Sequence, residues 1–407
     1  MRSAHNDGKY VRCTVLAAAS FMALLSGASA QTETKPIKIG VFMSLTGGSA
    51  ASSASNRFGA ELAIQEINAA GGIAHRPVVA VYGDDQADPT MGVSEIKRLV
   101  YQEKVDVVVG PNISQVNLAA LPVLDEAKIA SISDTGSPAL TPQAGPYHFT
   151  VEPSVTNSGK QMADYAVQVM HAKAPSLLND DGAAAQGASE SIKKTFADLG
   201  VKMTGQQQFK FHPGDVTPQL LSLRRGNPDV MLVEVASPDD AGVIQKNVQE
   251  IGWPIKEIGS LAFAASGPYA VKVAGPDAFK YSVAQIFKRF TYCPQTGKGD
   301  EVINAFIKRV TDAAKAKGVT ETDYFNIASA YDAVYVLKAA IEGSGSTEGP
   351  AIAAWIEQHV SEVPAISAEH LVASKTNHFM ISDDALTMAV QPDKRNADGL
   401  MQRANPC

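Results

Sequence analysis

The sequence of 407 residues lacks the motifs that mark the common classes of enzyme and metal protein. It has three cysteines and eight histidines, with no CxxC pair and no HExxH helix, which excludes the usual zinc centres. It also lacks the GxSxG turn of many serine hydrolases and the glycine-rich loop that binds nucleotide phosphates. A hydrolase with Ser114 as its nucleophile would need a histidine that the sequence does not assign to it. We therefore expect no enzymatic activity, no metal and no cofactor.

The chain also lacks an excess of positive charge and, after residue 30, any apolar run that approaches the ~20 residues needed to cross a bilayer. Its formal net charge is −7, and without residues 1–30, which hold three basic residues and one acid, it would be −9. Such a charge does not attract nucleic acid. With 45% hydrophobic and 19% charged residues, the composition is that of a globular chain long enough for two domains. We expect no nucleic-acid partner and no direct membrane insertion.

The N-terminus differs from the rest of the chain, because it combines positive charge with an apolar run. Three basic residues precede an apolar stretch over residues 15–25, and the small residues 27–30 (GASA) follow it. A basic head, a short apolar centre and an Ala-x-Ala site are typical of a cleavable signal peptide. Cys13 lies before the apolar stretch and not at the cleavage point, so a lipid-anchored cysteine is not expected. The sequence predicts a signal peptide over residues 1–30 and a secreted protein.

Two cysteines, Cys293 and Cys407, follow the predicted signal peptide. In an oxidising compartment an even pair is a candidate disulfide, which would tie the C-terminal tail to the body of the protein. Spacing alone does not show whether the two residues approach within bonding distance. A disulfide and two separate thiols both remain open at this point.

Short apolar runs alternate with amphipathic stretches along most of the chain. The first helix is expected to have Ser55 as its N-cap, and residues 237–240 (SPDD) are expected to start a later helix and not to bind a cation. This alternation of strands and helices is typical of a parallel sheet. The strands expected in the first half of the series cover residues 37–42, 78–82, 105–109 and 129–133.

A second series of strands and helices follows residues 149–153, an extended stretch that ends in a proline. We expect the chain to cross between two domains there. The predicted fold class is α/β, with two lobes that each contain a doubly wound parallel sheet and are joined by a multi-strand hinge. The first lobe is expected to hold residues 31–150 and 285–360. The second lobe, with the C-terminal tail, is expected to hold residues 151–284 and 361–407.

Several motifs, in their order along the chain, resemble the periplasmic family of branched-chain amino-acid-binding proteins. They are residues 44–47 (SLTG), 59–63 (GAELA), 82–89 (YGDDQADP), 107–111 (VVVGP) and 131–138 (SISDTGSP). The resemblance covers most of the chain after the predicted signal peptide. It implies a type I periplasmic binding fold, in which two lobes close by a hinge movement over a ligand in the cleft.

The same resemblance implies the substrate-binding component of an ABC import system in the periplasm. We expect a monomer that captures a small organic carboxylate and delivers it to the permease of the transporter. The ligand classes left open are an aromatic or other organic acid and a branched-chain or other amino acid. The alternative function is a subunit that reports the ligand to a receptor or regulator, because sequence does not separate transport from sensing.

Two strand ends are predicted to form the ligand site, since the ligands of open parallel sheets collect beyond the carboxyl ends of the strands. Asn112 and Ser114 follow one strand, and Ser114 is expected to cap the next helix. Thr135 and Ser137 follow the next strand. By resemblance, Ser114, Thr135 and Ser137 hold the carboxylate of the ligand. The alternative is that these residues only cap helices and close turns.

Departures from the family pattern concern the amino group of the ligand. Ser52 stands where amino-acid-binding members have a tyrosine, and residues 260–266 hold no carboxylate where the family has an acidic partner for an α-ammonium. An ammonium buried without an anion is costly, so the sequence favours a carboxylate without an amino group. Phe263 is then a candidate contact for an aromatic ring, or a core residue. Glu234, in a buried strand, is a candidate replacement for the missing acid, or pairs with a basic residue.

Overall fold

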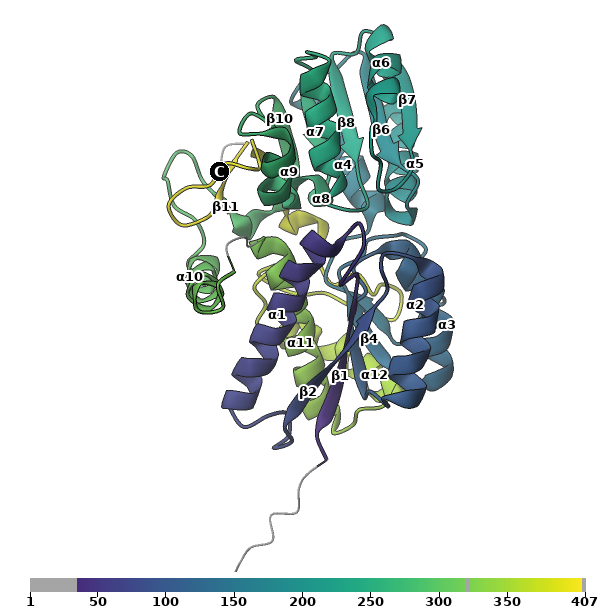
Figure 1. Cartoon of the computed structure of the whole chain (residues 1–407), viewed down its shortest axis with the longest axis vertical. Helices are drawn as coiled ribbons and strands as arrows, with labels where there is room; N and C mark the ends of the chain where they lie inside the picture. Colours follow the sequence, from purple (N-terminus) through teal and green to yellow (C-terminus); the bar gives the residue numbers. More distant parts are fainter. Residues whose placement is uncertain (1–34, 320–322, 405–407) are drawn as a thin grey trace, which may run out of the picture. The chain divides into compact units, whose positions relative to one another are not determined.

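The computed structural model describes residues 35–319 and 323–404, which form two β-sheets with their helices (Figure 1). The predicted signal peptide and Cys407 lie outside the described residues, so the pairing of Cys293 with Cys407 remains a prediction. Within the described ranges, no helix combines the length and the hydrophobicity that crossing a bilayer requires.

The sheet of the first lobe has five strands in the order β2-β1-β3-β4-β5, all parallel. Its strands are β1 Ile37–Met43, β2 Val78–Asp84, β3 Val107–Val109, β4 Ala130–Ser133 and β5 His148–Thr150. The helices that connect these strands are α1 Ala50–Ala69, α2 Pro89–Lys97 with the π-helix Arg98–Gln102, and α3 Ser114–Ala127. Two later helices, α11 Tyr324–Ser344 and α12 Gly349–His359, also pack in this lobe (Figure 1).

The core of the first lobe follows from its apolar strands. In β1, Ile37, Ile39 and Val41 are fully buried, as expected for a strand covered on both faces. The helices α1 and α11 pack closely against each other. A Cβ atom at Gly59 in α1 would lie 2.1 Å from the carbonyl oxygen of Ile327 in α11, so only glycine permits this approach. The pair fixes the N-terminal end of α1, which reaches the other lobe.

The sheet of the second lobe has eight strands in the order β11-β13-β12-β10-β9-β8-β6-β7. Strands β7, β6, β8, β9 and β10 are parallel, whereas β12 is antiparallel to β10 and β13. The strands are β6 Pro175–Asp180, β7 Gly205–Phe209, β8 Val230–Glu234, β9 Glu257–Gly259, β10 Ser282–Phe287, β11 Thr291–Tyr292, β12 Leu386–Val390 and β13 Met401–Arg403. The helices of this part are α4 Val155–Gln168, α5 Ala183–Asp198, α6 Thr217–Arg225, α7 Asp240–Glu250, α8 Leu261–Ala265 and α9 Gly267–Ala274.

The chain passes between the two sheets after β5, after β11 and before β12. The helix α10 Glu301–Ala316 and the 3-10 turns Val360–Glu362 and Asp383–Ala385 belong to these later passages, and the 3-10 turn Lys288–Phe290 joins β10 to β11. The crossings are tied together where Phe379 forms a β-bridge with Thr150. The predicted fold class is thus confirmed. The second sheet keeps β10 up to Phe287, past residue 285 where a return to the first lobe was expected.

The structure corrects three predicted helix starts. Helix α1 begins at Ala50, so Ser55 lies inside it and is not its N-cap. Helix α3 begins at Ser114 itself, with Ile113 as N-cap and no side-chain capping bond. Helix α7 begins at Asp240 and not at Ser237, because Ser237 and Asp239 make contacts with the first lobe. In each case the serine expected as the N-cap lies inside the helix or contacts the other lobe.

Candidate functional site

A cavity lies between the two lobes, where loops that follow the carboxyl ends of β3, β4 and β8 meet. The polar residues that line it from the first lobe and the crossing segment are Ser52, Asn56, Asn112, Ser114, Asp134, Thr135 and Glu152. Those from the second lobe include Glu234 and Ser260, and Asn326 of α11 lies beside them.

Five of the seven predicted ligand residues line this cavity, namely Ser52, Asn112, Ser114, Thr135 and Glu234. The other two, Ser137 and Phe263, do not. Ser137 closes its own turn by accepting a hydrogen bond from the amide of Ala139 at 3.4 Å. Phe263 is fully buried and packs edge-on against Phe279, with 5.1 Å between ring centroids. Phe263 is therefore a core residue of the second lobe, which is the alternative that the sequence had left open.

Ser114 reaches the cavity because it is the first residue of α3. The first amides of a helix have no intrahelical partner, and the helix dipole favours an anion beside them. The Asn112 side chain is held in the same loop, where its Nδ2 donates to Ser53 Oγ at 2.7 Å. This end of the cavity can therefore bind a carboxylate through a hydroxyl, an amide side chain and backbone amides.

Thr135 is fixed by a buried polar network. Its hydroxyl accepts a hydrogen bond from Asn117 Nδ2 at 2.8 Å and lies 2.7 Å from Ser133 Oγ. Asn117 Nδ2 also lies 2.9 Å from Nε2 of His148, a buried ring whose pKa is lowered to about 3 by desolvation and by His378, so it is neutral. The network presets the orientation of the Thr135 hydroxyl before any ligand binds.

Glu234 is the last residue of β8 and lines the cavity beside Ser260. Its side chain is 3% exposed, and Oε2 has no hydrogen-bond partner among the described residues. Burial raises its pKa to about 8, and the nearby Asp180 adds to this rise. A buried carboxyl oxygen without a partner is costly, so Glu234 is poised for a donor or a cation supplied by a ligand.

Two further acids line the cavity, and the sequence analysis missed both. Asp134 follows β4 and accepts a hydrogen bond from Asn56 Nδ2 at 2.5 Å, while burial raises its pKa to about 7. Glu152 lies between β5 and α4, and burial, Asp134 and Glu234 together raise its pKa well above the ordinary value. Asp134 adjoins the predicted Thr135, so its place was within reach of sequence reasoning. The inward direction of Glu152 in the crossing segment was not.

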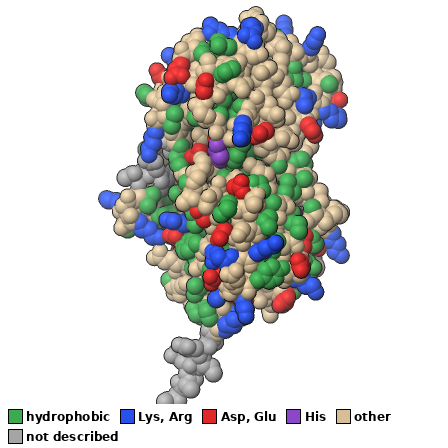
Figure 2. Space-filling view, turned by 45° about the vertical axis from the view of Figure 1, so that its right-hand side comes forward, with side chains coloured by type: hydrophobic (Ala, Val, Ile, Leu, Met, Phe, Trp, Pro, Cys, Tyr) green, Lys and Arg blue, Asp and Glu red, His purple; other side chains and the backbone are tan. Residues whose placement is uncertain are grey.

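The cavity differs in charge from the surface around it. None of the residues that line it is lysine, arginine or histidine. On the face shown in Figure 2, by contrast, basic and acidic side chains are interspersed. The three acids also do not form a group suited to one metal ion within the described part of the chain. The cavity therefore gathers carboxyl groups that the cationic group of an organic cation or zwitterion can ionise and pair with.

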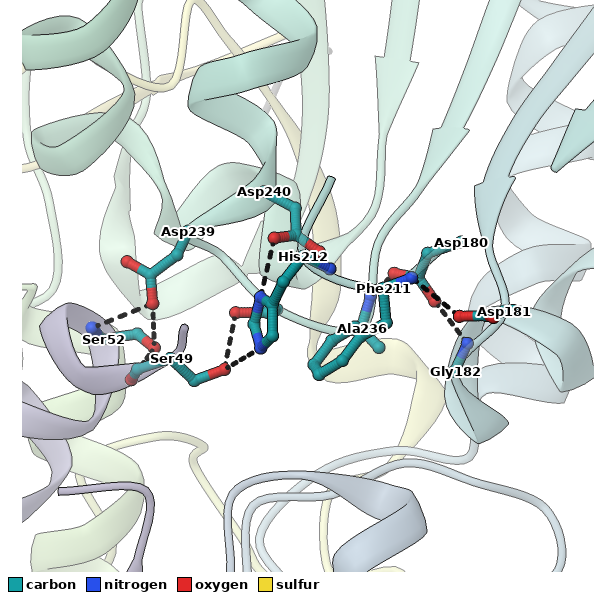
Figure 3. A network of polar contacts seen from close by, with 11 residues as sticks. Ser49, Ser52, Asp180, Asp181, Gly182, Phe211, His212, Ala236, Asp239 and Asp240 are labelled. Carbon is teal, nitrogen blue, oxygen red and sulfur yellow. Dashed lines mark hydrogen bonds and ion pairs between the residues drawn. The ribbon is translucent and has the colours of Figure 1, made fainter. Parts of the chain in front are cut away.

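Beside the cavity, a second set of polar contacts joins the lobes directly (Figure 3). In α1 and its N-cap, Ser52 Oγ donates to Asp239 Oδ2 at 3.0 Å, and Ser49 Oγ lies 3.0 Å from Ser237 Oγ. Ser49 Oγ also lies 3.3 Å from Nε2 of His212, whose Nδ1 is 3.0 Å from Asp240. We call these six interacting side chains the closing contacts. They hold the two lobes in a closed arrangement.

The comparison with protein families agrees with this geometry. Residues 36–395 match the family described as periplasmic binding protein. The chain belongs to this family. A Leu/Ile/Val-binding protein homologue (homolog 3) of Brucella melitensis is 26% identical to this binding protein over 341 residues, which are 84% of this chain and 87% of the relative. The resemblance stated from the sequence motifs is thus confirmed.

Solved structures share the fold of this binding protein. The substrate-binding protein of a branched-chain amino acid transporter from Streptococcus pneumoniae, in complex with isoleucine, is 22% identical with a TM-score of 0.75, covering 91% of this chain and all of that one. A solute-binding protein of an ABC transporter from Rhodopseudomonas palustris, in complex with 3,4-dihydroxybenzoic acid, is 19% identical with a TM-score of 0.70, covering 90% and 95%. Family members are extracytoplasmic substrate-binding proteins, which confirms that the chain is not an enzyme.

Proposed function

We propose that this chain is the substrate-binding component of an ABC import system, secreted to the periplasm by cleavage after residue 30. As a monomer, it closes its lobes over a small organic carboxylate and presents the closed form to a membrane permease. Family membership and the cavity between two hinged lobes support this role. Binding favours the closed form, because only that form offers contacts from both lobes.

The carboxylate of the ligand is assigned to the α3 end of the cavity. Ser114 and Thr135 offer hydroxyls there, Asn112 offers an amide side chain, and the first amides of α3 offer backbone donors. This assignment carries over the roles implied by the family resemblance for Ser114 and Thr135. It leaves out Ser137, whose hydroxyl belongs to its own turn.

The ligand also carries an ammonium group, so that it is an amino acid and not a carboxylate without nitrogen. The observation that supports this step is the partnerless Oε2 of Glu234, buried at the cavity from the second lobe. An ammonium donates hydrogen bonds to this oxygen and supplies the charge that stabilises the ionised carboxylate. Glu234 thus replaces the acid that residues 260–266 lack, which reverses the ligand preference drawn from the sequence alone.

Matched ligands test this function. The mature protein would be titrated calorimetrically with leucine and with 4-methyl-2-oxopentanoate, which differ only at the α-amino position, and with 3,4-dihydroxybenzoate. We expect heat of binding and a raised melting temperature with amino acids alone, since a ligand that binds only the folded state stabilises it. Binding of the oxo acid or the aromatic acid without binding of any amino acid would show that the ammonium assignment is wrong.

A further inference from the structure

The cavity holds more carboxyl groups than one ammonium group can pair with. Glu234 comes from the second lobe, Asp134 from the turn after β4, and Glu152 from the crossing segment after β5. Glu152 lies within electrostatic range of both other acids. An amino acid with an apolar side chain would bring one cation and one anion to these three carboxyl groups. Such a ligand would leave two of the three carboxyl groups without a cationic partner.

Neighbouring residues do not supply the missing positive charge. The half-buried Arg395 lies within electrostatic range of Asp323 and Asp393, so its charge is already opposed by two acids. Asp323, at the start of α11, in turn adds negative charge near Asp134. Asp180 does the same for Glu234 from the end of β6. The groups that surround the cavity acids therefore add carboxyl groups and no free cation to this region.

Asp134 and Glu152 also accept fewer hydrogen bonds than a carboxylate with a purely structural role. Within the described residues, no donor makes a hydrogen bond to the Glu152 carboxyl, although its Oε2 lies only 3.2 Å from the position that a Cβ atom at Gly136 would take. Asp134 has one side-chain donor, Asn56, which also donates to the carbonyl of Asn326 at 3.1 Å. By comparison, the structural carboxylate of Asp332 accepts bonds from the amides of Ile366 and Ser367.

We infer that the ligand carries a second cationic group, which binds between Asp134 and Glu152 while Glu234 binds the first. The inference rests on the proposed function, because it places the ligand carboxylate at Ser114 and Thr135. A carboxylate with two separated cations describes a basic amino acid, whose side chain ends in an ammonium or a guanidinium.

Pairs of ligands that differ in charge but hardly in size test the inference. They are arginine against citrulline and ornithine against norleucine, each titrated calorimetrically into the mature protein. We expect the cationic member of at least one pair to bind at least 30-fold more tightly. Equal or tighter binding of citrulline and norleucine would overturn the inference and leave the proposed function standing. Binding of oxo acids or aromatic acids in place of any amino acid would overturn both.

Substitutions of single cavity acids test where the second cationic group of the ligand binds. Glu152→Gln and Asp134→Asn should each reduce the preference for the cationic ligand at least fivefold, with little change for its neutral partner. Glu190→Gln is the matched control, because Glu190 is exposed on α5, away from the cavity, and its replacement changes the net charge equally. An unchanged preference in both cavity variants, with the melting temperature of the unliganded protein retained, would contradict the assignment.

Discussion

Two polar regions join the lobes, and they differ in how completely their acids are satisfied. Among the closing contacts, Asp239 accepts from Ser52, and Asp240 accepts from the amide of His212 at 3.2 Å and contacts its ring (Figure 3). In the cavity, Glu234 keeps a carboxyl oxygen without a partner. The closing contacts are thus complete without a ligand, whereas the cavity is not.

Because their acids differ in hydrogen bonding, we expect the closing contacts and the cavity to have separate roles. Complete hydrogen bonds stabilise the closed form by small amounts, about 1 kcal/mol each, because opening exchanges them for bonds to water. Buried acids with raised pKa values destabilise the closed form until a cation arrives. We therefore expect the cavity to determine whether the lobes close, and the closing contacts to adjust how tightly they do so.

The largest effect on binding is expected for Glu234→Gln. The amide keeps the shape of the side chain but removes the charge that the ammonium requires. Loss of one partner from a buried charge pair costs ~2–5 kcal/mol, so affinity for the amino acid should fall at least 30-fold in calorimetric titration. A fall of less than threefold would remove the basis for placing the ammonium at Glu234.

The same substitution should stabilise the unliganded protein at high pH. Because the pKa of Glu234 is raised to about 8 from an ordinary 4.5, the native state holds a proton that the unfolded chain has released. The native state thus binds more protons, and the free energy of unfolding falls as pH rises from about 4.5 to 8. Glu234→Gln should reduce this fall by a few kcal/mol and melt later than wild type at pH 8.5 but not at pH 4.5. Equal melting temperatures at pH 8.5 would contradict the raised pKa.

An intermediate effect is expected at the carboxylate end. Ser114→Ala and Thr135→Ala should each weaken binding about tenfold, since each removes one hydrogen bond to a charged group, worth ~1.5–3 kcal/mol. Ser137→Ala is the control from the same turn, and its affinity should match wild type, because Ser137 does not line the cavity. A loss at Ser137 equal to that at Thr135 would favour the role that the family resemblance gave it.

The contrast between these residues also shows how far sequence reasoning reached. Ser114 and Thr135 could be predicted because they follow parallel strands, and the carboxyl ends of such strands meet at one edge. Phe263 was left open between a ring contact and a core residue, because spacing does not encode the direction in which the short helix α8 turns its ring toward Phe279. Glu152 was missed because a crossing segment has no periodicity, so only the three-dimensional path shows which way its side chain points.

The closing contacts were misassigned for a related reason. Residues 237–240 have the composition of a helix start, and a local rule explains them without reference to the rest of the chain. Ser237 instead meets Ser49, which is 188 positions away in sequence. Contacts of that range depend on how the lobes close, so the local pattern cannot reveal them.

The smallest effect is expected for the Ser49 and Ser237 pair, whose side chains are fully buried but do not line the cavity. Ser49→Ala and Ser237→Ala should each weaken binding about two- to fivefold, because each breaks the neutral hydrogen bond between these two side chains, and Ser49→Ala also removes the contact with His212. The loss of affinity in the double variant should be smaller than the product of the two single losses, since both changes break the same bond.

The losses of affinity at Ser49 and Ser237 should be equal for every ligand, whereas the losses at Glu152 depend on the charge of the ligand. Calorimetric titration of the four proteins with a cationic and a neutral amino acid would measure both features. A ligand-dependent loss at Ser49 would mean that closure and recognition are not separate.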